Sequence, residues 1–263
     1  MMLEVTNLAK SYGDVPAIAD LTFGVAAQEF VCIVGPSGCG KTTLLKCLSG
    51  LLEPSRGTAV LDGTTVDGPP ETLALVFQEY SRSLLPWKTV LDNVLLPLRA
   101  KGLDKAEQRR LAMESLAEVG LADFTHAYPW QLSGGMQQRV AIARALAYQP
   151  KVLLMDEPFA SVDAQTRAEL EDLILKVRRH FGITVVLVTH DIDEAVYLAD
   201  RVVVLTKRPT KVAEVIDIDL PDDRDQVTTR ESPEFAHLRG QVARLIVGAQ
   251  PGDADTTNVG VAS

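Results

Sequence analysis

The chain has 263 residues, of which 46% are hydrophobic, and its formal net charge at pH 7 is −9. This length and apolar content suit one large globular domain or two modest ones with a packed core. The acidic balance argues against a general electrostatic attraction to nucleic acid, so we expect no nucleic-acid partner.

The N-terminus and the apolar runs carry no membrane signal. The chain starts Met1, Met2, Leu3, Glu4, without the basic region and apolar stretch that mark a signal peptide. No apolar run approaches the roughly 18 residues of a membrane span. We therefore expect any membrane role to come through a partner protein.

The three cysteines, Cys32, Cys39 and Cys47, are odd in number and form no C-x-x-C pair. No histidine lies at zinc-ligand spacing around them, which favours a reduced cytosolic setting. We expect Cys32 and Cys47 to be small buried residues, as free cysteines usually are.

Short apolar runs bounded by turn residues predict strands along much of the chain. These runs are Phe30 to Val34, Thr58 to Leu61, Leu73 to Phe77, Val152 to Met155, Thr184 to Val188, and Val202 to Leu205. Helical patterns lie between several of them, such as the i, i+3, i+4, i+7 spacing of Leu170, Leu173, Ile174 and Val177. Strands alternating with helices indicate an α/β fold with a mostly parallel core sheet.

The stretch from about 86 to 150 contains no convincing strand and predicts two or three helices, one of them amphipathic from Lys105 to Val119. We interpret it as an inserted helical subdomain of a larger domain spanning 2–232. Beyond Leu205, the alternation from Lys211 to Leu220 predicts edge strands. In the last segment, 233–263, Ser232 and Pro233 open a helix, and a disordered tail is expected from Ala249.

A glycine-rich run lies between the strand Phe30 to Val34 and a helix from Thr42 to Leu48. It fits G-x-x-x-x-G-K-[ST], and its residues are Gly35, Pro36, Ser37, Gly38, Cys39, Gly40, Lys41 and Thr42. A strand, a glycine loop and a helix N-terminus in this order point backbone N–H groups at phosphate. We expect Lys41 to bridge the β- and γ-phosphates and Thr42 to ligate Mg²⁺. Alkylation of Cys39 would then obstruct nucleotide binding.

Two adjacent carboxylates, Asp156 and Glu157, end the strand Val152 to Met155. Side chains alternate along an extended chain, so the two should project in different directions. We assign Asp156 to the Mg²⁺ shell and Glu157 to polarising the attacking water. An exposed acidic strand end is the plainer alternative.

A second phosphate-binding end is indicated by Ser133, Gly134 and Gly135, which precede an apolar helix beginning near Gln137. Their hydroxyl and backbone donors lie at a helix N-terminus, which favours an anion. A flexible Ser-Gly-Gly linker is the alternative, and the helix that starts at once after it fits that poorly.

The run from Leu132 to Arg139, between the glycine loop and the acidic pair, resembles the signature of ABC-type ATPases. The resemblance extends to about Val247. It implies a P-loop NTPase (RecA-like) core with an antiparallel β subdomain and an inserted helical subdomain. It also implies ATP and Mg²⁺ as cofactors and a homodimer in which the signature of one subunit closes over ATP held by the other.

This resemblance assigns further roles residue by residue. Gln78 would contact Mg²⁺ and water, and His190 would reach the γ-phosphate, although a polar residue at a strand end is often structural. Tyr12 would stack on adenine, Asp163 would belong to the D-loop, and Gln137 would join the signature contact in trans. The ATP-binding set is Tyr12, Gly35, Pro36, Ser37, Gly38, Cys39, Gly40, Lys41, Thr42 and Thr43. We expect Asp191 and Glu194, which follow His190, to be a helix-capping pair.

A narrower resemblance is to the importer ATPases for nitrate, sulfonate, taurine and related solutes. It rests on Phe77 to Tyr80, Leu84 to Trp87, Val90 to Val94, Phe159, and Asp163 to Arg167. In that family the segment after Gln78 contacts the permease, while a buried turn is the plainer interpretation of Leu84 to Trp87. The resemblance implies a permease, an extracytoplasmic solute-binding protein and a place on the cytoplasmic face of the membrane. A soluble ABC ATPase acting on nucleic acid, the ribosome or an assembly scaffold, and an exporter ATPase, stay open as alternatives.

Overall fold

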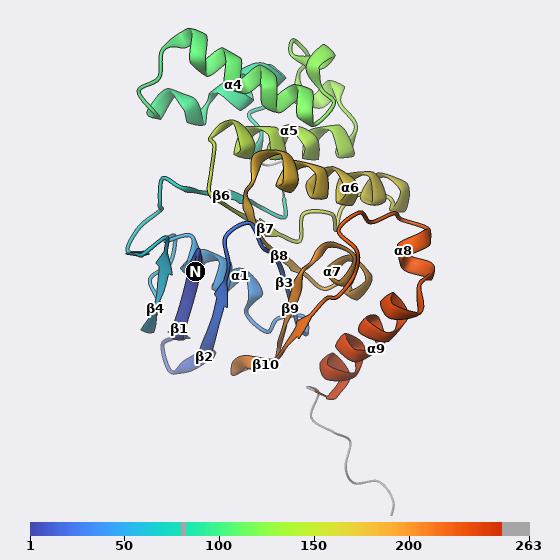
Figure 1. Cartoon of the computed structure of the whole chain (residues 1–263). Coiled ribbons are helices and arrows are strands. Elements are labelled where there is room, and N and C mark those ends of the chain that lie inside the picture. Colours follow the sequence, from blue (N-terminus) through green and yellow to red (C-terminus); the bar gives the residue numbers. More distant parts are fainter. Residues whose placement is uncertain (80–82, 249–263) are drawn as a thin grey trace, which may run out of the picture.

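The computed structural model describes residues 1–79 and 83–248 (Figure 1). Its ten-stranded sheet has the order β5-β4-β1-β2-β10-β9-β3-β8-β7-β6. The strands are β1 (Leu3–Tyr12), β2 (Val15–Val25), β3 (Phe30–Val34), β4 (Arg56–Leu61), β5 (Thr64–Thr65), β6 (Leu73–Val76), β7 (Val152–Asp156), β8 (Thr184–Thr189), β9 (Arg201–Leu205) and β10 (Thr210–Asp217).

The helices follow the same chain order. They are α1 (Lys41–Leu48), α3 (Val90–Leu95), α4 (Lys105–Glu118), α5 (Gly134–Ala147), α6 (Ala164–Phe181), α7 (Ile192–Leu198), α8 (Thr228–Glu231) and α9 (Pro233–Gly248). Short 3₁₀ turns are η1 (Pro97–Ala100), η2 (Ala122–Phe124) and η3 (Pro129–Gln131). No helix in the described part of the chain is long and apolar enough to cross a membrane.

The core of the sheet is parallel, as the sequence predicted. Strands β9, β3, β8, β7 and β6 are neighbours in that order and pair in parallel. Their side chains alternate between two apolar clusters, because each strand is buried on both faces: Phe30 and Cys32 face one cluster, while Val31 and Ile33 face the other. Burial on both faces explains the continuous apolar runs in these strands.

The remaining strands pair antiparallel with their neighbours, except that β10 pairs with β2 in parallel. The sequence patterns did not predict β1 and β2, although these are the longest strands described. Their pairing shifts register between Val5 and Leu8 and again near Lys10, so a strict apolar–polar alternation is lost. The prediction of edge strands over Lys211 to Leu220 is wrong, because β10 lies between β9 and β2 and ends at Asp217.

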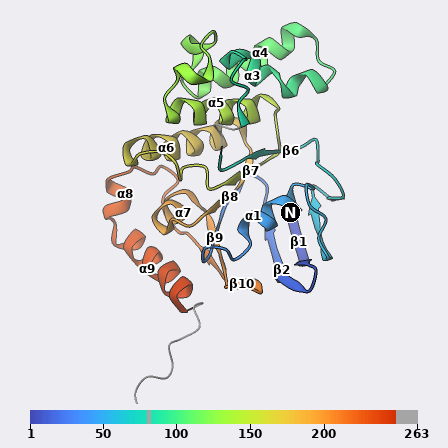
Figure 2. The same ribbon diagram turned by 180° about the vertical axis from the view of Figure 1, so that it is seen from behind.

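The helices α3, α4 and α5 form a layer at one end of the molecule, away from β1, β2 and β4 (Figures 1 and 2). Within residues 83–151 the structure contains helices and turns and no strand, as predicted. The amphipathic helix is α4, whose N-terminus is capped by Asp104, which accepts from the Glu107 N–H. Its buried side, including Leu111 and Leu116, packs on the apolar cluster shared with α5.

The chain ends, within the described residues, on α9. Ser232 caps it as predicted, because the Ser232 hydroxyl accepts a hydrogen bond from the Phe235 N–H at 3.1 Å. The tail expected from Ala249 and the motif residue Tyr80 lie outside the described residues.

Candidate active site

The predicted site residues meet because neighbouring parallel strands end at one edge of the sheet. The P-loop follows β3, His190 follows β8, Asp156 ends β7, and Gln78 lies two residues beyond β6. These strands are adjacent in the order β3-β8-β7-β6, and Asp156 is in register with Val188. Ligands of such sheets bind at the carboxyl ends of the strands.

The P-loop takes a backbone path that requires glycine. Gly38 has φ +74° and Gly40 has φ +111°, a conformation that side chains disfavour. Gly40 is also the N-cap of α1 and offers no side chain to the first-turn N–H groups of the helix. Those donors are left for a ligand, and their position at a helix N-terminus suits phosphate.

Lys41 is nearly buried at the start of α1. Its ammonium donates to the Gly35 carbonyl at 2.9 Å and to the Pro36 carbonyl at 3.4 Å. It also lies 4.0 Å from Glu157 Oε1. The Lys41 ammonium therefore lies between the P-loop and Glu157. A terminal phosphate bound there would place its negative charge next to this ammonium.

Asp156 is a buried carboxylate beside the P-loop helix. Its side chain is hydrogen-bonded to Thr42, and burial, the largest effect, raises the pKa of Asp156 above its ordinary value. A bound cation would offset that desolvation. Mg²⁺ in nucleotide sites uses one or two protein oxygens plus substrate phosphates, so Asp156 and Thr42 fit it without a larger cluster of acids. No cluster of three metal-binding His, Cys, Asp or Glu residues occurs in the described residues.

Glu157 turns away from Asp156 for a reason the sequence analysis did not predict. We expected both carboxylates on an extended chain, but β7 ends at Asp156 and Glu157 has φ +42°. The Glu157 N–H donates to the Val188 carbonyl at 2.8 Å, which holds this left-handed turn against β8. The two side chains separate because the backbone bends, and not because of strand alternation.

Glu157 joins the ends of three strands. Its Oε2 accepts a hydrogen bond from Gln78 Nε2 at 3.2 Å and lies 3.1 Å from His190 Nδ1. The Glu157 side chain is 18% exposed, whereas that of His190 is 60% exposed. The Glu157 carboxylate is mostly buried, is held by an amide and an imidazole, and lies 4.0 Å from the Lys41 ammonium. A carboxylate in this position can orient a water molecule for attack on a phosphate.

Tyr12 ends β1, outside this hydrogen-bonded group. Its ring is half exposed, with the Lys10 ammonium 5.8 Å from the ring centroid. The hairpin of β1 and β2 reaches the P-loop, since a Cβ at Gly40 would lie 3.5 Å from Ile18 Cγ1. The exposed Tyr12 ring is on the hairpin that contacts the P-loop.

The Ser-Gly-Gly run is a helix start and not a linker. Ser133 is the N-cap of α5, and its hydroxyl accepts from the Met136 N–H at 3.3 Å. Gln137 Nε2 donates back to the Leu132 carbonyl at 3.2 Å. Among the described residues, no hydrogen bond joins Ser133 or Gly134 to the P-loop of the same chain.

Gly135 packs against the helix that follows the D-loop. A Cβ on Gly135 would lie 2.3 Å from Thr166 Cγ2, so only glycine fits there. Thr166 is itself held by Asp163, the N-cap of α6, whose carboxylate accepts from the Thr166 N–H at 3.0 Å and hydroxyl at 2.7 Å. These hydrogen bonds lower the pKa of Asp163. The sequence analysis missed this tight contact between signature and D-loop.

The expected capping pair after His190 is half right. Asp191 caps α7 by accepting from the N–H groups of Asp193 and Glu194. Glu194 instead turns inward, is 4% exposed, and accepts a hydrogen bond from the Thr189 hydroxyl at 3.2 Å. Its burial beside Glu171 and Asp191 raises the pKa of Glu194 to about 8. The sequence signal for this buried hydrogen bond was Thr189, directly before His190, and the sequence analysis overlooked it.

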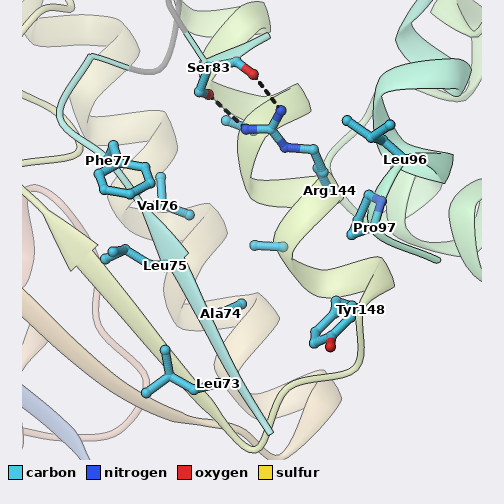
Figure 3. A pocket seen from close by; sticks show the side chains of 12 residues that line it. Leu73, Ala74, Leu75, Val76, Phe77, Ser83, Leu96, Pro97, Arg144 and Tyr148 are labelled. Atoms are coloured by element: carbon cyan, nitrogen blue, oxygen red, sulfur yellow. Dashed lines mark hydrogen bonds between the residues drawn. The ribbon is translucent and has the colours of Figure 1, made fainter. Parts of the chain in front are cut away.

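A groove of about 320 Å³ lies beside β6, on the side of the helical layer (Figure 3). β6 supplies one wall, Leu96 and Pro97 supply another, and Arg144 of α5 and its C-cap Tyr148 line the rest. Arg144 donates to the Ser83 carbonyl at 2.6 Å and to its hydroxyl at 2.7 Å. Gln78, which bonds Glu157, lies two residues beyond the strand that lines this groove.

Comparison with known proteins decides the family. The family model described as "ABC transporter" matches residues 18–160, more than half of the chain. The chain belongs to the ABC transporter family. Its parallel core strands, P-loop and signature helix are thus those of an ABC ATPase. The chain is an ATP-binding, ATP-hydrolysing cassette.

Curated relatives of this ABC ATPase include import proteins. It is 48% identical to an uncharacterized ABC transporter ATP-binding protein of Methanocaldococcus jannaschii, over 93% of this chain and 91% of the relative. It is 44% identical to the taurine import ATP-binding protein TauB of Yersinia pestis, over 92% and 95%. It is 41% identical to the nitrate import ATP-binding protein NrtD of Synechocystis, over 95% and 97%.

Solved structures with the same fold include transporter cassettes. The CbiO1 component of a Clostridium perfringens ABC transporter aligns with TM-score 0.76 and 29% identity, over 82% of this chain and 88% of that one. A dimeric ATP-binding cassette bound to ADP and Pi aligns with TM-score 0.72 and 34% identity, over 84% and 100%. The predicted fold class, a P-loop ABC ATPase, is therefore confirmed.

Proposed function

We propose that this ABC ATPase is the energy-supplying subunit of an importer, acting as a homodimer on the cytoplasmic face of the membrane beneath a separate permease. The observation that carries the proposal is the position of Gln78. Its amide bonds Glu157 at the strand edge, and the strand before it lines the groove of Figure 3. A partner seated in that groove would act on the residue that touches the hydrolytic carboxylate.

Within one chain, the P-loop and Lys41 hold the phosphates, and Tyr12 stacks on adenine. Glu157 orients the attacking water, assisted by Gln78, and His190 contacts the terminal phosphate. Thr42, Gln78 and Asp156 are the residues that would hold Mg²⁺. When bound, Mg²⁺ would neutralise charge on the β- and γ-phosphates.

We assign Ser133, Gly134, Gly135 and Gln137 to the ATP held by the second subunit. The capped start of α5 is a phosphate-binding helix end, and it makes no hydrogen bond with its own P-loop in the described residues. Asp163 holds Thr166 at the start of α6, and Thr166 packs on Gly135, so the D-loop and the signature of one chain are in direct contact. The dimeric ADP- and Pi-bound relative supports this arrangement.

The turn after the groove supports a permease contact. Leu84 is buried, while Trp87 is 70% exposed. Asn93, fully buried, anchors the turn by accepting from the Leu85 N–H and donating to the carbonyls of Leu85 and Lys88. A fixed turn that presents an indole to solvent has the form of a docking site. The turn is thus partly buried, through Leu84, and partly available to a partner, through Trp87.

The names of the import relatives favour nitrate, taurine or a related small solute, such as another sulfonate. In such a system an extracytoplasmic solute-binding protein would deliver the solute to the permease. Neither of these partners needs contact with the ATP site, so solute identity is decided outside this chain.

The test is a search for a permease gene beside this chain's gene, followed by reconstitution of the two proteins together. We expect the permease to copurify with the chain, to stimulate ATP hydrolysis, and to move solute inward in vesicles. Trp87→Ala should lose the stimulation and keep basal hydrolysis, whereas Trp130→Ala, equally exposed at 70%, should keep both. Outward movement would establish an exporter, and copurification with ribosomes without permease binding would establish the soluble alternative.

A further inference from the structure

The C-terminal segment packs beside the helices that follow the D-loop and His190. Helix α9 runs along α7 on one side of the sheet, and α8 lies next to α6 and α7 (Figures 1 and 2). Phe235 and Val242 of α9 are buried in the apolar cluster of that face. The segment therefore contacts both the helix that follows Asp163 and the helix that follows His190.

Arg230 on α8 connects α6 with α7. Its Nη2 donates to Glu171 Oε2 on α6 at 2.7 Å, and Glu171 is 1% exposed. Its guanidinium also lies 4.8 Å from the ring centroid of Tyr197 on α7 and 5.8 Å from that of Phe235. One side chain thus neutralises a buried acid on one helix and stacks on an aromatic ring of the other.

Gln226 completes the connection. Its Nε2 donates to Asp172 Oδ1 at 2.8 Å and to the Ala168 carbonyl at 3.1 Å, and its Oε1 accepts from Arg230 Nε at 3.0 Å. The Tyr197 hydroxyl donates to the same Asp172 oxygen at 2.7 Å. Residues 226–230 therefore add to the direct hydrogen bond between α6 and α7, because Gln226 and Arg230 contact acidic residues of α6 while Arg230 also lies against Tyr197 of α7.

The first turn of α6 and the N-cap of α7 meet beside His190. Arg167, in the first turn of α6, donates to Asp191 Oδ2 at 2.9 Å. The Asp191 N–H donates to the Thr189 hydroxyl at 3.0 Å, and that hydroxyl donates to Glu194. His190 lies between Thr189, which the sheet places at the end of β8, and Asp191, which Arg167 of α6 contacts.

We propose that Arg230 is a positioning residue for ATP hydrolysis: by fixing α6 against α7 it keeps His190 Nδ1 on Glu157. This rests on the proposed roles of Glu157 and His190. Arg230 itself touches neither the phosphates nor the reacting water. It acts by limiting the freedom of the exposed His190 imidazole, whose misplacement by about 1 Å can cost up to 10² in rate.

The experiment is a double-mutant cycle on the purified full-length chain, with kcat, the KM for ATP and thermal unfolding recorded for each variant. Arg230→Met should lower kcat about tenfold and leave the KM for ATP within about twofold, because the P-loop is untouched. Arg230→Lys keeps the charge but loses the two-pronged contact, so it should recover part of the rate. Arg244→Met, an exposed arginine on α9, is the matched control and should match the parent.

The cycle separates positioning from general stability. In a His190→Ala background, Arg230→Met should have almost no further effect on kcat, since the group it positions is gone. Equal losses in both backgrounds, or a parent-like kcat for Arg230→Met, would overturn the proposal. If Arg230→Met unfolds, Gln226→Ala takes its place in the same cycle. This variant removes the Gln226 hydrogen bonds to Asp172 and Arg230 and leaves Arg230 on Glu171. Should His190→Ala alone hydrolyse ATP at the parent rate, the assigned role of His190 would fall instead.

Discussion

Glu157 and His190 lie 33 residues apart in the sequence, yet Glu157 Oε2 and His190 Nδ1 are 3.1 Å apart. The contact exists because β7 and β8 are neighbours in register and the backbone turns sharply at Glu157. Gln78 reaches the same carboxylate oxygen from β6. The carboxylate is thus held from two sides, and this constraint leads to the first prediction.

Glu157→Gln should bind ATP normally and hydrolyse it about 10²- to 10⁴-fold more slowly, because the amide cannot act as a base. Nucleotide binding by fluorescence and phosphate release under saturating ATP measure the two effects separately. Glu4→Gln, at an exposed position on β1, is the control and should leave both unchanged. Near-normal hydrolysis by Glu157→Gln would refute the assignment.

Gly135→Ala should loosen the contact between α5 and α6 and lower hydrolysis, because the added Cβ would lie 2.3 Å from Thr166 Cγ2. Overpacking of this kind costs about 1–3 kcal/mol. Thr166→Ser removes that methyl group and keeps the hydroxyl bound to Asp163, so the double variant should regain activity. If Thr166→Ser gave no recovery, the loss would not come from this contact.

The composite site predicts that hydrolysis depends on dimerisation. The rate per chain should rise with protein concentration in step with the dimer fraction measured by light scattering. Ser133→Ala should lower hydrolysis and leave nucleotide binding to the P-loop intact, whereas Lys41→Ala should weaken the binding itself. A monomer that hydrolyses ATP as fast as the dimer would contradict the arrangement.

Glu194 should make the protein less stable as the pH rises. Its pKa is about 8 in the folded chain and has an ordinary value of 4.5, so the folded state holds a proton that the unfolded state releases between these pH values. Folded-state stability therefore falls from about pH 4.5 to about pH 8 through this group, and above that range the penalty is constant. Arg167 and Thr189 oppose the shift, while Glu171 and Asp191 increase it.

Glu194→Gln removes the titration and keeps an acceptor for the Thr189 hydroxyl. Its advantage in melting temperature over the parent should be small at pH 5 and should grow up to about pH 8. Glu234→Gln, an exposed position on α9, is the control and should show no such growth. A constant difference for Glu194→Gln across this range would mean that Glu194 is ionised in the folded chain throughout.

Much of the site followed from local sequence because its chemistry is local. The P-loop glycines, Lys41 and the capped helix start at Ser133 each depend on neighbouring residues only, and the structure shows the expected strand, loop and helix at each. The parallel strands were equally clear, because strands buried on both faces have continuous apolar runs in the sequence. Strands β1 and β2 were missed because their register shifts break the alternation on which a prediction depends.

The sequence by itself determined the family, the phosphate loop, the acidic strand end and the helix starts, because each is a short run whose backbone and side chains act within a few residues. Tertiary structure alone decided which of these meet. The order of β3, β8, β7 and β6 joins Gln78, Glu157 and His190, the close approach to Thr166 requires glycine at 135, and Arg230 ties α6 to α7. These contacts link segments far apart in the chain, and a local sequence pattern cannot predict the packing that brings them together.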